Sequence, residues 1–445
     1  MKKIFSKTII EYLRFLTHLY LKRWKVDIIG VTGSVGKTTV TLAIHKILSK
    51  KYRTGMTYKD KHGLNSETGI PFAVLDVHIE GYSLFNWIKY LFSATYNFFT
   101  KKFKYEKYIV EMGVDKPDDM IHLLKMLQPD VGVFLSMAKV HGENFEELLK
   151  VNKNKEIIDL IFEEKAKLVE SISKSGWSVL NQDDKMIYGL FKGVESRKIT
   201  FGLNHKANVK GKILKVTSKC FSAEICYKGE CKVLNIKKYL VNGNVLKTFL
   251  AAITVGLIND IKLDDCIKAI EDLDFPPGRM TKIEGIKKTL IIDSSYNSSK
   301  PALIEALENL NLFKNSKRIA VLGDMRELGI EEESEHREAA RKAVNIADEF
   351  VLIGPAMKKY FYDEALKQGF DKSKMYTFLN TWKALDFIKD DLLKGGEVIL
   401  VKGSQNTLFL EIIVEGLMGD SSEAEEILCR RGSFWKRKRL SLKDN

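Results

Sequence analysis

The chain has 445 residues, of which 45% are hydrophobic and 29% charged, a composition typical of a folded globular protein with two or three domains. Its five cysteines are odd in number and form no Cys-x-x-Cys pair, so we expect neither a disulfide framework nor a zinc site, and a reducing cytoplasm fits better. The net charge of +14 lies mainly at the two ends: residues 1–25 and 430–445 each carry seven Lys or Arg and one acidic residue. A nucleic-acid-binding protein would more often carry a basic stripe across its folded domain, so no nucleic-acid partner is expected.

The chain opens with a predicted amphipathic helix over residues 8–24, within an N-terminal segment that ends at residue 25. Charges such as Glu11 and Arg14 interrupt any signal-peptide core, and no run of 18 apolar residues predicts a transmembrane helix.

A phosphate-binding loop follows almost at once. Residues 26–32 are a β-branched run that predicts a buried strand, and apolar residues from Val40 to Leu48 recur with helical spacing. The turn between them has the residues that cradle an anion on backbone N–H groups at a helix N-terminus: Gly33, Ser34, Val35, Gly36, Lys37, Thr38 and Thr39. Lys37 would reach the β- and γ-phosphates of a nucleotide, and Thr38 would offer its hydroxyl to Mg²⁺. An ordinary tight turn is the alternative.

The short Thr-Gly-x-x-Gly-Lys-Thr-Thr spacing resembles that of the Mur ligases, the ATP-dependent amide-forming enzymes of peptidoglycan precursor synthesis. A second resemblance is the run from Asn65 to Pro71, which is similar to the substrate-facing Asn-Asn-Glu-x-Gly-x-Pro segment of the family members that add D-alanyl-D-alanine. It implies substrate contacts for Asn65, Ser66 and Glu67, whereas a plain connector is the alternative.

Three further positions are implied as metal ligands. Residues 107–113 predict a buried strand, and Glu111 stands where parallel strands end and ligands collect, opposite Thr38. The strand at 131–136 is followed by His141, which matches a family histidine at a second metal, although Ser136 stands where the family has Asn. Lys165 matches the lysine that Mur ligases carbamylate into a carboxylate-like ligand; a solvated helical lysine is the alternative.

Residues 197–238 alternate in short runs that predict an antiparallel meander closing the first domain. The helix after it departs from the family, because Asn244 and Thr248 stand where Mur ligases have a His and an adenine-contacting Asn. Residues 275–280 then predict a linker, and its Arg279 matches the family arginine that contacts the ATP phosphates, as its bidentate geometry suits. A linker salt bridge is the alternative.

A second α/β pattern begins near residue 290. Strands are predicted at 289–292, 318–322, 349–353 and 398–401, and helices near 301–311, 334–346 and 381–393. Resemblance to the D-alanyl-D-alanine-adding members implies that Asp293 faces the ATP ribose. It also implies that the substrate side is formed by Asp324, Arg326, Glu327 and Lys402.

The predicted fold is α/β: a P-loop central domain, with a parallel sheet and a small antiparallel meander, followed by a Rossmann-like C-terminal domain. The predicted boundaries are 1–25 for the N-terminal helix, 26–278 for the central domain, 279–420 for the C-terminal domain and 421–445 for a basic tail. Because about 25 residues precede the phosphate strand, we expect the family's UDP-sugar-binding domain to be absent or reduced to one helix.

The resemblance implies an ATP- and Mg²⁺-dependent ligase that adds D-alanyl-D-alanine to a nucleotide-linked or lipid-linked muramoyl-peptide through an acyl phosphate. A folylpolyglutamate-type or other peptide-adding Mur ligase is an alternative, as is a non-ligase P-loop ATPase at the membrane. Residues 83–105 hold nine aromatics with four interleaved lysines, and both chain ends are basic. These features predict a cytoplasmic protein with a peripheral contact to anionic lipid, whereas packing of the aromatics on the ATPase domain is the alternative.

Overall fold

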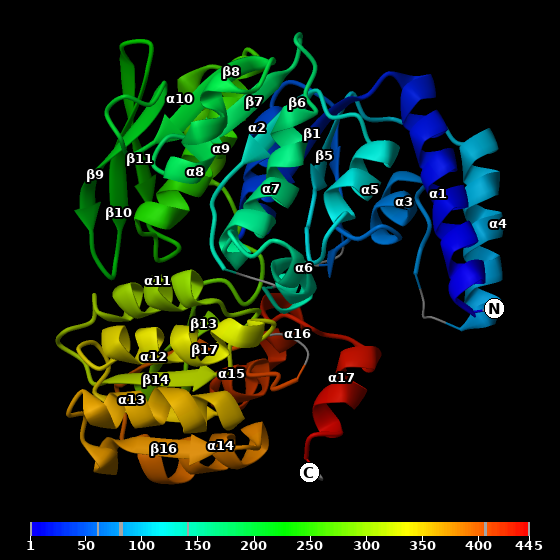
Figure 1. Ribbon diagram of the computed structural model, residues 1–445. Coiled ribbons are helices and arrows are strands. Elements are labelled where there is room, and N and C mark those ends of the chain that lie inside the picture. The colour runs from blue at the N-terminus through cyan, green and yellow to red at the C-terminus, as the bar shows by residue number, and fades with distance from the viewer. Residues whose placement is uncertain (1, 60–61, 80–82, 140–141, 405–406, 444–445) are drawn as a thin grey trace.

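The structure, a computed structural model, consists of two α/β domains stacked on one another (Figure 1). It describes residues 2–59, 62–79, 83–139, 142–404 and 407–443. The central domain holds the phosphate loop, and the C-terminal domain begins after the Gly278–Arg279 linker. A two-stranded ribbon, Tyr58–Lys59 (β3) with His62–Gly63 (β4), lies outside the two main sheets.

The central domain is built on one nine-stranded sheet in the order β11-β10-β9-β8-β7-β6-β1-β5-β2. The phosphate strand β1 lies in its interior, hydrogen-bonded to parallel β5 and β6. Its near-continuous β-branched sequence suits a strand covered on both faces. The strands are β1 Asp27–Thr32, β2 Thr54–Met56, β5 Lys107–Glu111, β6 Val131–Phe134, β7 Trp177–Asn181, β8 Arg197–Gly202, β9 Val209–Val216, β10 Phe221–Tyr227 and β11 Glu230–Ile236.

The predicted meander is shorter than residues 197–238 suggested. Strand β8 pairs in parallel with both β7 and β9, so only β9–β11 are antiparallel. The β10–β11 hairpin also corrects the cysteine expectation, because it places Cys226 directly opposite Cys231 and the two form a disulfide. Sequence spacing missed this pair because cross-strand neighbours are set by hairpin register rather than by a Cys-x-x-Cys turn.

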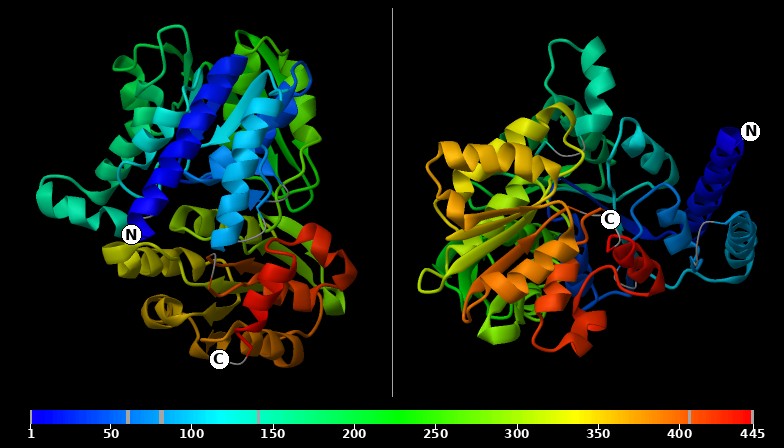
Figure 2. Two further views of the ribbon diagram at one scale, coloured as in Figure 1. Left: turned by 90° about the vertical axis from the view of Figure 1, so that its right-hand side faces the viewer. Right: turned by 90° about the horizontal axis from the view of Figure 1, so that it is seen from below.

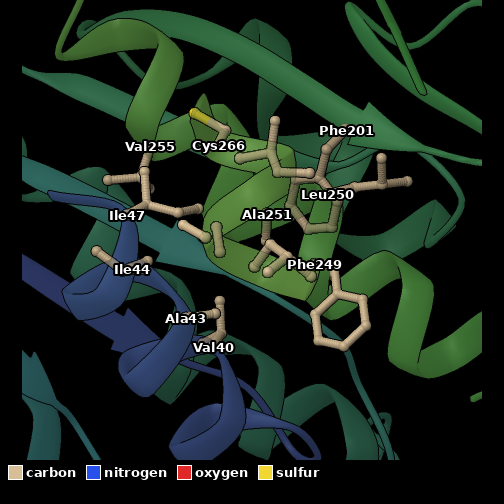
Figure 3. Close-up of a cluster of buried hydrophobic side chains, with 14 of the residues drawn as sticks. Val40, Ala43, Ile44, Ile47, Phe201, Phe249, Leu250, Ala251, Val255 and Cys266 are labelled. Atoms are coloured by element: carbon tan, nitrogen blue, oxygen red, sulfur yellow. The ribbon is translucent and has the colours of Figure 1, made fainter. Parts of the chain in front are cut away.

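Helices cover both faces of this sheet. On one face, α2 packs against α9 and α10, and Val40, Ile44 and Ile47 interlock with Phe249 and Leu250 (Figure 3). This packing anchors the helix whose first turn forms part of the phosphate site. The helices of this face are α2 Lys37–Leu48, α9 Gly243–Ile258 and α10 Leu263–Glu271; the others are α1 Lys2–Trp24, α3 Gly69–Val74, α4 Leu84–Thr100, α5 Asp119–Met126, α6 Glu146–Val151, α7 Ile157–Glu170 and α8 Lys185–Gly189.

The predicted N-terminal helix is confirmed as α1, and it packs on α3, α4 and α5. Helices α1 and α4 lie side by side at one edge of the molecule, as all three views show (Figures 1 and 2). None of the helices in the described ranges is both long and apolar enough to cross a membrane.

The C-terminal domain confirms the second α/β pattern. Its six-stranded sheet has the order β12-β13-β17-β14-β15-β16, parallel except for β12, and the four predicted strands form its middle. The short edge strands β12 and β16 were not predicted. The elements are β12 Thr281–Glu284, β13 Leu290–Ser294, β14 Arg318–Gly323, β15 Glu349–Ile353, β16 Met375–Phe378, β17 Val398–Lys402, α11 Lys300–Leu310, α12 Glu332–Ala343, α13 Tyr362–Lys367, α14 Thr381–Phe387, α15 Glu411–Leu417, α16 Ala424–Ile427 and α17 Ser433–Leu440.

The basic tail docks on the C-terminal domain. Arg430 and Glu411 form a buried ion pair, 3.0 Å from Nη1 to Oε2, and Arg439 donates to the backbone oxygen of Arg430. The ring of Trp435 packs against Phe409.

Candidate active site

The phosphate loop takes its shape from two glycines. Gly33 and Gly36 have φ angles of +151° and +88°, which L side chains rarely adopt. Both are also crowded: a Cβ on Gly33 would lie 2.9 Å from the Leu135 Cβ, and one on Gly36 would lie 2.9 Å from the Thr248 Oγ1. The loop therefore leaves a backbone-lined hollow at the N-terminus of α2, where an anion is favoured.

Ser136 supports this loop from the end of β6. The Ser34 N–H donates to the Ser136 carbonyl oxygen at 2.9 Å, and the Val35 N–H donates to the Ser136 Oγ at 3.2 Å. The Ser34 hydroxyl in turn donates to the Ala138 carbonyl oxygen at 3.1 Å. Although the family pattern has Asn at position 136, the serine hydroxyl here makes a specific contact with the loop.

Lys37, Thr38 and Glu111 converge at the mouth of the loop. The Lys37 Nζ donates to the Gly33 carbonyl oxygen at 2.8 Å, and burial lowers the pKa of this lysine, partly opposed by the Glu111 carboxylate. The Thr38 hydroxyl donates to Glu111 Oε2 at 2.9 Å and accepts from Arg279 Nη2 at 3.0 Å. Thr38 and Glu111 thus lie next to one another, and Arg279 of the linker contacts the same threonine; their roles toward Mg²⁺ and the ATP phosphates stay predictions.

The donor set at Glu111 suits a hard cation. Its carboxylate lies at the carboxyl end of β5, and its other oxygen accepts from the Asn65 Nδ2 at 3.4 Å. A carboxylate and a threonine hydroxyl are oxygen ligands of the kind that Mg²⁺ takes beside nucleotide phosphates. The residues present therefore fit a magnesium ion.

Lys165 lies on α7, with a side chain that is 1% exposed. Its Nζ has no hydrogen-bond partner among the residues that the structure describes. Burial, and next the nearby Lys37 ammonium, lower its pKa to about 7. The neighbouring Glu164 turns elsewhere, accepting from the Met120 N–H and pairing with Lys167. Lys165 is thus a buried amine rather than the solvated helical lysine of the alternative interpretation. His141, the other predicted metal ligand on this side, lies outside the described residues.

A cleft of about 740 Å³ lies between the two domains. The central domain contributes the loop residues from Ser34 to Thr39, together with Asn65 and Glu111, and the linker contributes Arg279. The C-terminal domain contributes Lys402, Glu327 and the segment from Tyr296 to Ser299. Burial, and next the Arg279 guanidinium, lower the pKa of Lys402 to about 7.

Several predicted site residues do not line this cleft. Ser66 caps α3 by accepting from the Gly69 N–H, Glu67 pairs with Arg14 of α1, and Asp293 is fully buried and accepts from the Ser295 N–H. Asp324 accepts from the Met357 N–H, and the Arg326 N–H donates to the Ser404 Oγ. Ser66, Glu67, Asp324 and Arg326 therefore stay predictions as substrate contacts, and Asp293 stays a prediction as the ribose contact.

The cleft residues that were not predicted as site residues include Asp115, Tyr296 and Glu305. Asp115 lies electrostatically close to both Lys37 and Lys165. Burial raises the pKa of Glu305 to about 7, opposed by Lys402. Asp115, four residues beyond Glu111, carried a usable signal, because it follows the same strand end.

The two domains are closed on one another. Lys139 pairs with Glu331 at 2.9 Å between Nζ and Oε1, and the Ile330 N–H donates to Glu146 Oε1 at 2.8 Å. At the hinge, the Tyr296 ring lies between two guanidinium groups, with the Arg279 Cζ at 4.6 Å and the Arg430 Cζ at 5.2 Å from its centroid. Arg430 from the tail and Arg279 from the linker thus both contact this ring.

Arg430→Met is expected to lower the free energy of unfolding of the C-terminal domain by about 3 kcal/mol, because it leaves the Glu411 carboxylate buried without its partner. Urea unfolding followed by the fluorescence of Trp382 and Trp435 measures the loss. Adding Glu411→Gln removes the buried charge and should restore most of the lost free energy of unfolding. A double variant that is as unstable as Arg430→Met would show that the ion pair is not the cause.

Fold and site together define a two-domain P-loop protein that closes over a nucleotide-sized cleft. The family model described as the Mur ligase middle domain matches residues 31–86 and 90–256, and the Mur ligase glutamate ligase domain matches residues 278–405. The chain therefore belongs to the Mur ligase family, whose members are ATP-dependent ligases that form C–N bonds.

Two curated relatives of this chain carry the same name. The chain is 25% identical over 409 residues to the UDP-N-acetylmuramoyl-tripeptide–D-alanyl-D-alanine ligase of Buchnera aphidicola, covering 90% of this chain and 79% of the relative. It is 25% identical over 415 residues to the ligase of the same name from Borreliella burgdorferi, covering 90% and 77%. The same fold occurs in MurF from Acinetobacter baumannii, with a TM-score of 0.74, 21% identity and coverage of 92% and 81%. MurF from Thermotoga maritima in complex with ADP has a TM-score of 0.72, 24% identity and coverage of 92% and 83%.

Proposed function

We propose that this protein adds D-alanyl-D-alanine to a muramoyl-peptide by ATP-dependent amide formation, as the names of its relatives state for them. The muramoyl-peptide is carried on a nucleotide, or on a lipid at the inner face of the membrane. The observation that carries the proposal is the cleft itself: Lys37, Glu111 and Arg279 face residues of a second domain across a space of about 740 Å³, large enough for a nucleotide.

The chemistry follows from the poor reactivity of a carboxylate toward an amine. The peptide carboxylate attacks the γ-phosphorus of ATP, forming an acyl phosphate and releasing ADP. The amine of the dipeptide then attacks the acyl carbon, and phosphate leaves as the amide forms. Lys37 and Arg279 neutralise the charge that develops on the phosphoryl oxygens, and domain closure excludes water from the acyl phosphate.

Thr38 and Glu111 are proposed to hold Mg²⁺, which when bound supplies positive charge to the ATP phosphates. Lys165 is proposed to react with carbon dioxide to form a carbamate. The reaction requires the neutral amine, and a pKa near 7 leaves a substantial neutral fraction at physiological pH. The buried, unpartnered Nζ supports this assignment.

The amine substrate is tested by ADP release in the presence of a muramoyl-tripeptide. We expect D-alanyl-D-alanine to stimulate release on the order of 100-fold more than L-Ala, D-Glu or a diamino acid, because a site built to bind a dipeptide leaves polar groups unpaired with a shorter ligand. Greater stimulation by L-Glu with a folate would favour a folylpolyglutamate-type ligase instead. ATP turnover that needs no amine would indicate a P-loop ATPase.

A further inference from the structure

The outer face of α4 exposes a continuous apolar stripe. Phe85, Phe92 and Phe99 are 76%, 73% and 69% exposed, and Ile88 and Tyr96 lie between them at spacings of three and four residues. Residues with this spacing share one face of a helix. Five large exposed apolar side chains in one row are more than the scattered surface residues of an ordinary soluble domain.

The opposite face of α4 is equally apolar. Trp87 and Tyr90 pack against Phe72 of α3, and Phe98 packs against Tyr20 of α1. A helix that is apolar all round is normally buried on all sides. In the part of the chain that the structure describes, α4 is covered on one side only. It therefore carries more large apolar side chains than packing on the central domain requires.

Helix α1 extends the stripe into a broader surface. Tyr12 and Phe15 are 38% and 59% exposed, and the Tyr12 hydroxyl lies 2.8 Å from the Thr95 Oγ1 of α4. The two helices run alongside one another at the edge of the molecule (Figure 2). We call the α1/α4 face the surface formed by Tyr12, Phe15, Phe85, Ile88, Phe92, Tyr96 and Phe99.

Basic residues flank the α1/α4 face. Residues 83–105 contain four lysines and no acidic residue. The exposed side chains where both helices end are mostly cationic: Lys22, Arg23, Lys25, Lys101, Lys102 and Lys104. Acidic residues near these cations are paired with bases: Asp76 with Lys101, Glu11 with Arg14, Glu106 with Arg53 and Asp27 with Lys107. An apolar row bordered by cations matches the interface of an anionic bilayer, where acyl chains lie beneath phosphate groups.

We propose that the α1/α4 face docks peripherally on an anionic membrane surface. A second copy of this chain is the poorer occupant, because a two-fold contact would bring together two α4 segments that each carry lysines and no acid. The tail helix α17 faces the same side of the molecule and exposes Phe434, Lys436, Arg437 and Lys438 (Figure 2). Helix α17 would therefore add positive charge to the same membrane contact.

Helix α1 connects the docking face to the loop that carries Asn65. The buried Arg14 of α1 pairs with Glu67, 3.1 Å from Nη2 to Oε1, and Glu67 follows Asn65, which contacts Glu111. The Arg14–Glu67 ion pair thus links the α1/α4 face to the loop whose Asn65 contacts the Glu111 carboxylate. Docking would bring the protein to a lipid-linked acceptor, and this advantage rests on the proposed function. Docking itself does not depend on the proposed function.

The test is co-sedimentation of the full chain with vesicles of phosphatidylcholine alone or mixed with phosphatidylglycerol. We expect binding to the mixed vesicles that weakens at high salt. Phe92→Gln with Phe99→Gln should lower partitioning on the order of 100-fold, since each phenylalanine loses about 1.5 kcal/mol or more of transfer free energy. The matched control is Leu214→Gln with Val233→Gln, two exposed apolar residues on the meander at the far end of the sheet, which should bind as the wild type does.

Three results would overturn the proposal: a chain that stays in the supernatant with mixed vesicles at low salt, equal binding to neutral vesicles, or a Phe92/Phe99 variant that binds normally. Sedimentation velocity without lipid tests whether a second copy of the chain binds this face. If the wild type is a dimer and the Phe92/Phe99 variant is a monomer, the face is a self-association surface. ADP release with soluble substrates should stay unchanged in the variant, so failure of docking and failure of the ligase proposal are distinguishable.

Discussion

Lys37→Ala abolishes ADP formation, lowering turnover by about a thousandfold or more, while the melting curve stays unchanged. The Lys37 ammonium lies inside the phosphate loop, held 2.8 Å from the Gly33 carbonyl oxygen, where the β- and γ-phosphates would be bound. Removing a preorganised charge from such a site typically costs two to three orders of magnitude in rate or more. Because burial lowers the pKa of this lysine, the folded protein gains little stability from its charge, and the fold should tolerate alanine.

The matched controls are Lys50→Ala, an exposed residue just beyond the C-terminal end of the same helix, and Glu106→Ala, just before the strand that carries Glu111. Both should turn over ATP normally, whereas Glu111→Ala should fail as Lys37→Ala does. Near-wild-type activity in either site variant, with intact folding, would disprove the assignment of the ATP site.

Lys165→Ala is the second large effect. If the Lys165 carbamate is a metal ligand, its removal should slow ADP formation about a hundredfold or more, and a small added carboxylate such as formate should restore part of the rate by occupying the same space. Lys167→Ala, two residues along the same helix on a partly exposed side chain, is the control and should keep its activity. Full activity of Lys165→Ala without added carboxylate would remove this residue from the site.

Lys165 also predicts that the rate of ADP formation falls at acidic pH. Carbamate formation needs the neutral amine, and protonation increases as the pH falls through the Lys165 pKa of about 7. We therefore expect wild-type activity to decline below neutrality and to recover partly with added bicarbonate. Formate-rescued Lys165→Ala should lack that response to bicarbonate.

The sequence was sufficient for the elements with strong local signals. The phosphate loop, Glu111 at its strand end and the alternating pattern after residue 290 each follow from spacing that one turn or one strand determines. The edge strands β12 and β16 were missed because four-residue segments with one-sided pairing carry little periodicity. Glu305 and Tyr296 become part of the cleft only through closure of the two domains, which no local pattern encodes.

The sequence also could not show which way the side chains of a loop face. The run around Asn65 was predicted as one substrate-facing unit, yet Asn65 faces the cleft while Glu67 turns to Arg14. Which side of a loop each residue faces depends on the helix that packs behind it, here α1. The cysteine pair at 226 and 231 likewise depended on hairpin register.

The cluster of cations in the cleft has a practical consequence for ligand screening. Lys37, Lys165, Lys402 and Arg279 hold like charges close together, and the pKa of each of the three lysines is lowered. Any anion that enters relieves this repulsion and stabilises the folded state by mass action. Sulfate, pyrophosphate and phosphate buffers should all raise the melting temperature, so a thermal-shift screen in such buffers would report charge rather than substrate. Zwitterionic dipeptides that shift the melting temperature in a non-phosphate buffer are the informative hits.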